Sequence, residues 1–222
     1  MSHVVPVLAI DGPSGSGKGT VSRAVARRLG WNFLDSGAIY RALGLAVERD
    51  GLSLDDQDAV ARLAGRMDLR FSSGEPPSVW LDQIDVTDRI PTESCGAMAS
   101  AVAALKPVRQ ALLQKQRDFR QLPGLVADGR DMGTVVFPDA EFKVFLTASA
   151  AVRAQRRHKQ LKEKGVDVTL ARLTKDIEER DERDRTRAEA PLRIADGALV
   201  IDSSDLGIDE VIARCLAVVG VL

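Results

Sequence analysis

The stretch Gly12-Pro13-Ser14-Gly15-Ser16-Gly17-Lys18-Gly19-Thr20 decides the fold of this chain. An apolar run at 5–10 precedes it and a helical pattern at 21–29 follows it, which predicts a strand, a glycine-rich turn and a helix start. In such a turn the backbone N–H groups converge on one anion, and the helix start adds unpaired donors and a partial positive charge. The pattern predicts that residues 12–20, here called the phosphate loop, bind a nucleoside triphosphate, with Lys18 reaching its outer phosphates. A flexible Gly/Ser linker is the alternative.

The loop departs from the usual pattern at one position. The residue after Lys18 is Gly19, and the hydroxyl comes one position later, at Thr20. The usual hydroxyl ligand for magnesium is therefore missing from its usual place. The variant resembles the loops of nucleoside monophosphate kinases, which implies that phosphates and water hold most of the metal shell. We accordingly assign no protein residue as a direct metal ligand.

Composition restricts the class of protein. The chain has 222 residues, 45% of them apolar, and a formal net charge of −1. These values fit one globular domain with a real core, and they favour neither nucleic acid nor an anionic membrane as a partner. No apolar run approaches the ~20 residues that a membrane span needs. Cys95 and Cys215 have no metal-site spacing, and we expect them to be reduced. A cytoplasmic monomer is expected.

Short apolar runs alternate with longer helical patterns along the chain. Strands are predicted at 5–10, 31–34, 125–127, 142–146 and 198–201. Helices are predicted at 18–29, 39–49, 93–104, 107–121, 150–164, 169–185 and 208–218, with Pro107 at a first helical position and Thr169 as an N-cap. This alternation predicts an α/β fold in which a parallel sheet has helices on both faces and binds its ligands at the carboxyl ends of the strands.

One region breaks the alternation. Residues 69–90 predict hairpin-like β structure, with one turn at 74–77 and another at Asp82-Gln83. A helical pattern at 55–67 leads into it. We therefore predict a small inserted subdomain at 50–93, which is too small to bury much surface alone.

The second predicted strand runs into Asp35-Ser36-Gly37-Ala38-Ile39-Tyr40-Arg41. Gly37 permits a tight turn, and Ser36 is a candidate cap for the helix that follows. Arg41 then lies in the first turns of that helix, where a cation opposes the helix dipole. We interpret Arg41 as a phosphate clamp, and a solvated surface arginine is the alternative.

The next strand ends in Asp128-Gly129-Arg130-Asp131-Met132-Gly133-Thr134. Asp128 stands where a strand-end carboxylate meets a magnesium ion through water. Arg130 and Asp131 follow a glycine turn, so both can point into a cleft. A carboxylate and a guanidinium at one strand end suit nucleotide recognition, whereas an ion-pair network within the turn is the alternative.

The segment 150–187 is the most highly charged. Acid-before-base pairs four residues apart, such as Asp181–Arg185, support a solvated helix. Arg180, Asp184 and Arg187 also form an i, i+4, i+7 stripe that would line a nucleotide cleft. The helical period does not decide whether this stripe or the pair Arg183–Arg187 faces the cleft. Because the segment has few apolar residues, we predict that 150–187 is a mobile lid.

The sequence offers no evident general base. Its two histidines are His3, near the N-terminus, and His158, among basic side chains. A kinase that acts on an alcohol usually needs a carboxylate to orient the hydroxyl. A phosphate monoester, with a second pKa of about 6, is already largely ionised at neutral pH. Many arginines and no base therefore favour a monophosphate as the acceptor.

Taken together, the motifs at 9–20, 34–41 and 127–138, and the pattern from Glu179 through Arg187 to Leu192, resemble the bacterial cytidylate kinase family. The resemblance runs from Val5 to the end of the chain. It implies the P-loop nucleoside monophosphate kinase fold in a single domain over 1–222, with a nucleotide-binding insert at 50–93 and a lid at 150–187. It also implies Mg²⁺-dependent, reversible transfer of a phosphoryl group from ATP to CMP or dCMP, without a covalent intermediate, in pyrimidine metabolism.

The resemblance also implies the roles of individual residues. The phosphate loop would hold ATP, namely Gly12, Pro13, Ser14, Gly15, Ser16, Gly17, Lys18, Gly19 and Thr20. The acceptor nucleotide would be bound by Ser36, Arg41, Ser100, Arg109, Arg130, Asp131, Arg180, Asp184 and Arg187. Of these, Ser100, Arg109 and Asp131 would read cytosine, and Arg180 and Asp184 would approach the sugar. The catalytic set would be Lys18, Asp128, Arg130 and Arg187.

The sequence leaves two other functions open. The first is a kinase for another small acceptor, such as UMP, AMP or a metabolite alcohol. The second is an RNA-binding module that uses the basic lid, with the nucleotide as a switch. Near-neutral charge and the lack of aromatic clusters speak against the second.

Overall fold

The computed structural model describes residues 5–72, 78–163 and 165–220. Its contacts separate two compact units, the first made of Met1–Leu34 with Phe119–Leu222 and the second of Asp35–Asp118. The second unit includes the predicted insert at 50–93. His3, the predicted turn at 74–77 and the last predicted residue of the 150–164 helix lie outside the described residues.

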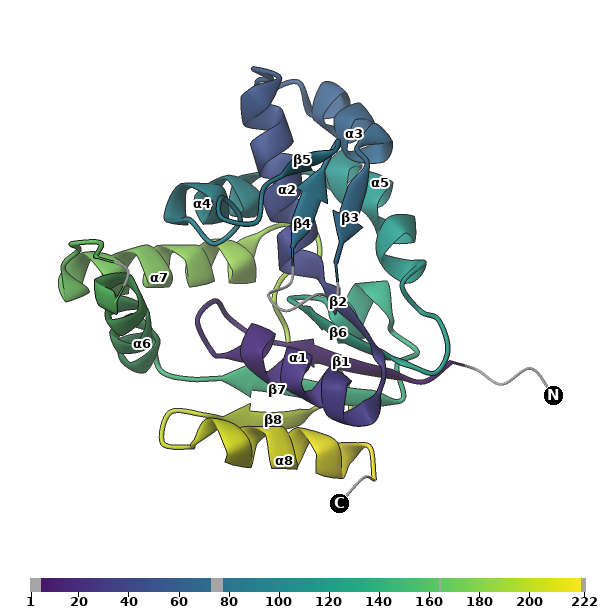
Figure 1. Ribbon diagram of the computed structural model, residues 1–222, viewed down its shortest axis with the longest axis vertical. Coiled ribbons are helices and arrows are strands. Elements are labelled where there is room, and N and C mark those ends of the chain that lie inside the picture. The colour runs from purple at the N-terminus through teal and green to yellow at the C-terminus, as the bar shows by residue number, and fades with distance from the viewer. Residues whose placement is uncertain (1–4, 73–77, 164, 221–222) are drawn as a thin grey trace. The chain divides into compact units, whose positions relative to one another are not determined.

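A five-stranded sheet forms the centre of the first unit (Figure 1), in the order β2-β6-β1-β7-β8. Its strands are β1 (Val7–Asp11), β2 (Asn32–Asp35), β6 (Leu125–Gly129), β7 (Phe142–Thr147) and β8 (Leu199–Asp202). Strand β1 pairs in parallel with β6 and β7, and β7 pairs in parallel with β8. The parallel α/β sheet predicted from the apolar runs is confirmed, with each strand within two residues of its predicted ends.

Helices α1 (Lys18–Leu29) and α8 (Ile208–Val218) pack side by side against this sheet (Figure 1). Both match their predicted bounds. Val21 and Val25 of α1 meet Val211 and Ile212 of α8 over the apolar strand residues, in one buried cluster that also contains the free thiol of Cys215. This packing fixes the start of α1, and with it the phosphate loop, at the carboxyl end of β1.

Three further elements complete the first unit. A single π-helical turn, η1 (Met132–Val136), follows β6. Helices α6 (Ala150–Glu163) and α7 (Leu170–Thr186) pack against each other, and Thr169 caps α7 by accepting a hydrogen bond from the Arg172 N–H, as predicted. The two helices share a small apolar core of their own, made of Ala154, Leu161, Val168, Leu173 and Ile177.

The second unit pairs helices and carries a small sheet. Helix α2 (Ser36–Arg49) packs on α4 (Glu93–Val102), and α3 (Gln57–Arg66) packs on α5 (Lys106–Arg117). Pro107 is the second residue of α5 and not the first, because α5 begins one residue earlier than predicted. Strands β3 (Leu69–Phe71), β4 (Val79–Leu81) and β5 (Ile84–Asp85) form an antiparallel sheet. The predicted turn at Asp82-Gln83 is confirmed, and both residues have positive φ.

One local expectation in this unit is wrong, and one alternative reading is excluded. Asp35, not Ser36, caps α2, because its carboxylate accepts from the Ala38 N–H at 2.9 Å while Ser36 is the first helical residue. Arg41 is also no solvated surface arginine, since it donates to the carbonyls of Ile90 and Thr92 at 2.7 and 3.1 Å. Among the described residues, none of the helices has both the length and the apolar content needed to cross a membrane.

Candidate active site

The phosphate loop joins β1 to α1 and depends on two glycines. A Cβ on Gly12 would lie 1.9 Å from the Leu146 carbonyl oxygen, so only glycine lets the loop pass so close to β7. Gly15 has φ +78°, a left-handed conformation that favours glycine. Gly15 and Gly17 are exposed to solvent. The part of the loop around Gly15 and Gly17 is therefore open to a ligand.

Lys18 is buried at the start of α1, and its ammonium lies inside the loop. It donates to the Pro13 carbonyl at 2.7 Å and to the Ser16 hydroxyl at 3.4 Å. Burial, assisted by the charge of Arg130, lowers the pKa of Lys18 to about 7, against the opposing pull of Asp128. A cation held this way would gain from a negative ligand in the loop.

Asp11 is the last residue of β1 and lies directly before the phosphate loop. Its buried carboxylate accepts from the backbone N–H groups of Met132 and Gly133, both at 2.8 Å. Burial raises the pKa of Asp11 to about 7, although these two hydrogen bonds oppose the shift. Asp11 thus holds the turn η1 against the end of β1, a contact that the sequence did not suggest.

Asp128 stands at the end of β6, as predicted, and it is buried. Its Oδ2 would lie 3.5 Å from a Cβ placed on Gly19. The carboxylate therefore faces the first turn of α1, at the position where other phosphate loops carry a hydroxyl. The described residues contain no group of three or more His, Cys, Asp or Glu side chains arranged to hold a metal.

Arg130 and Asp184 connect the turn after β6 to α7. The Nε of Arg130 donates to Oδ2 of Asp184 at 3.0 Å, and both side chains are largely buried. Burial alone would raise the pKa of Asp184, but the charges of Arg130, Arg180 and Arg187 outweigh it and hold that pKa below its ordinary value. Asp184 therefore stays ionised near neutral pH, which supports a charged cluster here.

Arg187 and Asp131 make a second connection between the same two segments. An Arg187 guanidinium nitrogen lies 3.7 Å from Oδ1 of Asp131, and both side chains are buried. The same guanidinium donates twice to the carbonyl of Ala190, a residue in the left-handed region at φ +48°. The turn after β6 is thus tied to α7 across the chain and is not a closed local ion-pair network.

These contacts decide between the two stripes left open by periodicity. Asp184 is buried and Arg180 and Arg187 are partly buried, whereas Arg183 is exposed. The stripe Arg180–Asp184–Arg187 lies on the side of α7 toward the turn after β6. Asp181 does not form the expected pair with Arg185, because its carboxylate pairs with Arg153 of α6.

Arg153 is a residue that sequence reasoning missed. It is one of five lysines and arginines in α6, and nothing in the local pattern separates it from the others. In the structure it is 4% exposed, with hydrogen bonds to Ala148, Ser14 and Asp181. It therefore touches the phosphate loop and α7 at once.

Four predicted site residues belong to the second unit. Ser36 is buried, and its hydroxyl donates to Oε1 of Gln116 at 2.7 Å. The buried Ser100 hydroxyl has no hydrogen-bond partner among the described residues. The Arg109 guanidinium lies 5.6 Å from the centre of the Tyr40 ring and donates to the Ala103 carbonyl. Arg41, the fourth, is held by the carbonyls described above.

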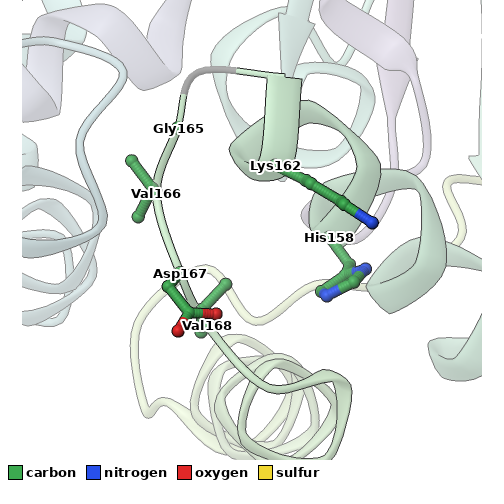
Figure 2. A pocket seen from close by; sticks show the side chains of 6 residues that line it. All are labelled: His158, Lys162, Gly165, Val166, Asp167 and Val168. Carbon is green, nitrogen blue, oxygen red and sulfur yellow. The ribbon is translucent and has the colours of Figure 1, made fainter.

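A separate cavity of about 330 Å³ lies where α6 turns into α7 (Figure 2). His158 and Lys162 extend from α6, and Val166, Asp167 and Val168 line the opposite segment (Figure 2). None of its lining residues belongs to the phosphate loop or to the charged cluster around Asp184. His158 therefore lines a cavity that shares no residue with the candidate site.

Comparison of the sequence with known proteins identifies one family. The sequence matches the family model described as cytidylate kinase over residues 8–220. A cytidylate kinase of Methylococcus capsulatus (strain ATCC 33009 / NCIMB 11132 / Bath) is 64% identical over 219 residues, which cover 99% of each chain. A cytidylate kinase of Aeromonas salmonicida (strain A449) is 56% identical over 98% of this chain and 95% of its own. A solved gluconokinase of Sinorhizobium meliloti 1021 has a TM-score of 0.47 at 16% identity, over 98% of this chain and 92% of its own.

Proposed function

Because this chain belongs to the cytidylate kinase family, and is thus a nucleoside monophosphate kinase that transfers a phosphoryl group from ATP to CMP, we propose how its residues divide that work. The observation that carries the proposal is the charged cluster at the carboxyl end of the sheet. There Lys18, Asp128 and Arg130 from the sheet and loop meet Arg180 and Asp184 from α7. We further propose that dCMP is a second acceptor.

The phosphate loop binds the triphosphate of ATP. Its N–H groups and the start of α1 offer donors and partial positive charge to the phosphate oxygens. Lys18, already inside the loop, exchanges its bond to the Pro13 carbonyl for the outer phosphates. This exchange places a cation where negative charge is greatest during transfer.

The residues beside the loop fit Mg²⁺. Asp128 offers carboxylate oxygens, which this cation prefers, and Gly19 has no side chain in the space beside them. Contact through water agrees with the reluctance of Mg²⁺ to lose its hydration shell. When bound, the ion would neutralise charge on the transferring phosphates.

The acceptor nucleotide is bound through its phosphate and its sugar by separate sets of side chains. Arg41 and Arg130 hold its phosphate with Ser36 nearby, and Arg187 bridges the two phosphate groups. Arg180 and Asp184 bind the sugar.

Cytosine is read by Ser100, Arg109 and Asp131. Cytosine presents an amino donor beside ring-nitrogen and carbonyl acceptors, so Asp131 accepts while Arg109 and Ser100 donate. The unpartnered hydroxyl of Ser100 supports this assignment. Uracil would turn a carbonyl oxygen, instead of an amino group, toward the buried carboxylate of Asp131, which costs binding energy.

The reaction itself needs positioning and charge neutralisation more than proton transfer. A phosphate oxygen of the acceptor attacks the terminal phosphorus of ATP in line, the bond to the bridging oxygen breaks, and ADP and the nucleoside diphosphate leave. The attacking oxygen is already ionised, which removes the need for a base. The guanidinium groups of Arg130 and Arg187, with Lys18, offset the repulsion between the two anions. No covalent intermediate forms.

We also propose a cytoplasmic location, a monomeric state and no role for nucleic acid as a partner. The net charge of −1 supports the last of these. RNA retention that falls with salt, in a protein without kinase turnover, would favour the RNA-binding alternative instead.

The test is a panel of CMP, dCMP, UMP and AMP with ATP and Mg²⁺, followed by release of ADP. We expect CMP and dCMP to give the highest kcat/KM. A clear preference for UMP over both cytidine nucleotides would contradict the cytosine assignment. In the same panel Asp131→Ala should chiefly reduce discrimination against UMP, whereas equal losses for all four acceptors would refute the role of Asp131.

A further inference from the structure

We propose that Arg153 is a positioning residue that couples the phosphate loop to helix α7, so that ATP on the loop and CMP beside α7 strengthen each other's binding. The inference rests on the proposed function, because it takes the loop as the ATP site and the α7 stripe as part of the CMP site. It adds a residue that touches neither nucleotide in that assignment.

The guanidinium of Arg153 makes four hydrogen bonds to three separate segments. Its Nε donates to the Ala148 carbonyl, just after β7, at 2.9 Å. One terminal nitrogen donates to the Ser14 carbonyl of the phosphate loop at 2.9 Å and to Oδ1 of Asp181 at 3.1 Å. The other donates to Oδ2 of Asp181 at 2.5 Å. The pair with Asp181 is therefore bidentate, the arrangement that fixes direction as well as distance.

The bond to Ser14 bears on the anion site through the geometry of the peptide group. A trans peptide is planar, and its C=O and N–H point in opposite directions. Holding the Ser14 carbonyl on Arg153 therefore turns the Gly15 N–H to the opposite side of that peptide. The side chain of Arg153 also lies against Gly15, because a Cβ placed there would be 3.3 Å from the Arg153 Cβ. Arg153 thus sets the orientation of the Gly15 N–H and the position of Gly15 within the phosphate loop.

The bond to Asp181 acts at the other end. Asp181 lies three residues before Asp184, so the two share roughly one face of α7. Fixing Asp181 bidentately fixes the rotation of α7 about its axis, and with it the direction of Arg180, Asp184 and Arg187. If the Ser14 carbonyl moves, the Arg153 guanidinium that binds it must move as well, and Asp181 is bound to the same guanidinium. The phosphate loop and the α7 stripe are therefore connected through one rigid planar group.

The experiment measures the coupling directly. The dissociation constant of CMP is determined by calorimetry on the full chain, with and without saturating β,γ-imido-ATP and Mg²⁺. In the wild-type protein we expect the analogue to tighten CMP binding at least about 5-fold, the lower end of typical coupling between sites. In Arg153→Lys and in Asp181→Asn the ratio should fall to about 1–2. Lysine keeps the charge but loses the planar fork, and asparagine keeps the shape but loses the charge.

A matched control comes from the same helix. Asp176 also pairs with an arginine, Arg172, but at 3.9 Å and with both side chains largely exposed. The variant Asp176→Asn should keep the wild-type ratio. A merely structural role for Arg153 would lower the melting temperature of its variants without changing the ratio measured on the folded protein.

Binding measured on the wild type and on the variants distinguishes the proposed function from the role of Arg153. Wild-type protein that binds neither CMP nor the analogue contradicts the proposed function. Wild-type protein that binds both without synergy, or folded variants that retain it, overturns the role of Arg153 alone. Should both variants fail to fold, amide hydrogen exchange of the wild-type protein decides: the analogue alone must protect amides of α7, and unchanged exchange there refutes the coupling.

Discussion

Arg130 and Asp184, which lie 54 residues apart in the sequence, are joined by a 3.0 Å hydrogen bond between Nε and Oδ2. Both side chains are largely buried, so the bond forms where water screens charge poorly. It fixes Arg130 relative to α7 and holds one face of α7 toward the turn after β6.

Removing that carboxylate should therefore impair turnover. In Asp184→Asn the Arg130 guanidinium loses its charged partner, and hydrogen bonds to charged groups are worth about 1.5–3 kcal/mol. We expect kcat/KM for CMP to fall about 10- to 100-fold. Steady-state kinetics with saturating ATP measures this. The control is Glu182→Gln on the same helix, whose exposed partner is Arg185 and which should remain within twofold of wild type.

Binding of ATP should take up a proton from the buffer. With a pKa of about 7, Lys18 is about nine-tenths neutral at pH 8 in the ligand-free protein. The negative charge of a triphosphate raises that pKa, so binding at pH 8 protonates the amine. Calorimetry of β,γ-imido-ATP binding in buffers of different ionisation enthalpy should give different heats, and Lys18→Met should remove the difference. Identical heats in all buffers would count against it. The same variant should lose turnover severely.

The pKa of Asp11 predicts how stability depends on pH. Its value is about 7 in the folded protein and 3.8 when unfolded, so between these values the folded state holds a proton that the unfolded state has released. The free energy of unfolding contributed by Asp11 is therefore full below pH 3.8 and is lost as pH rises toward 7.

Urea unfolding at pH 5 and 6.5 compares the wild type with Asp11→Asn. Asparagine does not titrate, so the wild type should lose about 1–2 kcal/mol relative to the variant between these two pH values. Asparagine also loses one acceptor for the N–H groups of Met132 and Gly133 at every pH, which shifts the whole curve but not its slope. Parallel curves for the two proteins would show that Asp11 does not titrate in this range.

Gly12→Ala should abolish stable folding of the first unit. The added Cβ would lie 1.9 Å from a backbone oxygen of β7, where no side-chain movement relieves the clash. We expect a loss of more than about 4 kcal/mol, the range of exceptional substitutions. Gly207→Ala is the control, because its φ is −70° and a Cβ there has nothing within 4 Å. Thermal melting followed by circular dichroism distinguishes the two, and a Gly12→Ala protein that melts like wild type would refute the clash.

Local rules predicted most of the fold. Short apolar runs gave all five strands of the parallel sheet, and helix patterns placed α1 and α8 at their observed bounds. The phosphate loop was predictable because its glycines, its lysine and its place between a strand and a helix are all local in sequence. Asp128 was predictable for the same reason, as it lies one residue before the end of a buried strand.

Contacts between distant segments were not predictable by such rules. The spacing of four residues assigned Asp181 to Arg185, yet Asp181 pairs with Arg153, which lies 28 residues earlier on another helix. Asp11 directly follows the strand predicted at 5–10, and its two hydrogen bonds reach residues more than 120 positions away. The cap of α2 was misassigned for a different reason: Asp35 and Ser36 are both good caps, and the helix begins at Ser36 itself, one residue earlier than a Ser36 cap requires.

The apolar core shared by α6 and α7 differs in kind from the hydrogen bonds and ion pairs that join these helices to the phosphate loop and to the turn after β6. Ala154, Leu161 and Leu173 hold the two helices together by apolar contact, and the Arg153–Asp181 pair joins the same two helices. The bonds from these helices to the rest of the unit all depend on a guanidinium group: Arg153 binds Ser14 and Ala148, Arg130 binds Asp184, and Arg187 lies against Asp131. A polyanion, which competes for guanidinium groups, would therefore act on these outer bonds and leave the apolar core unchanged.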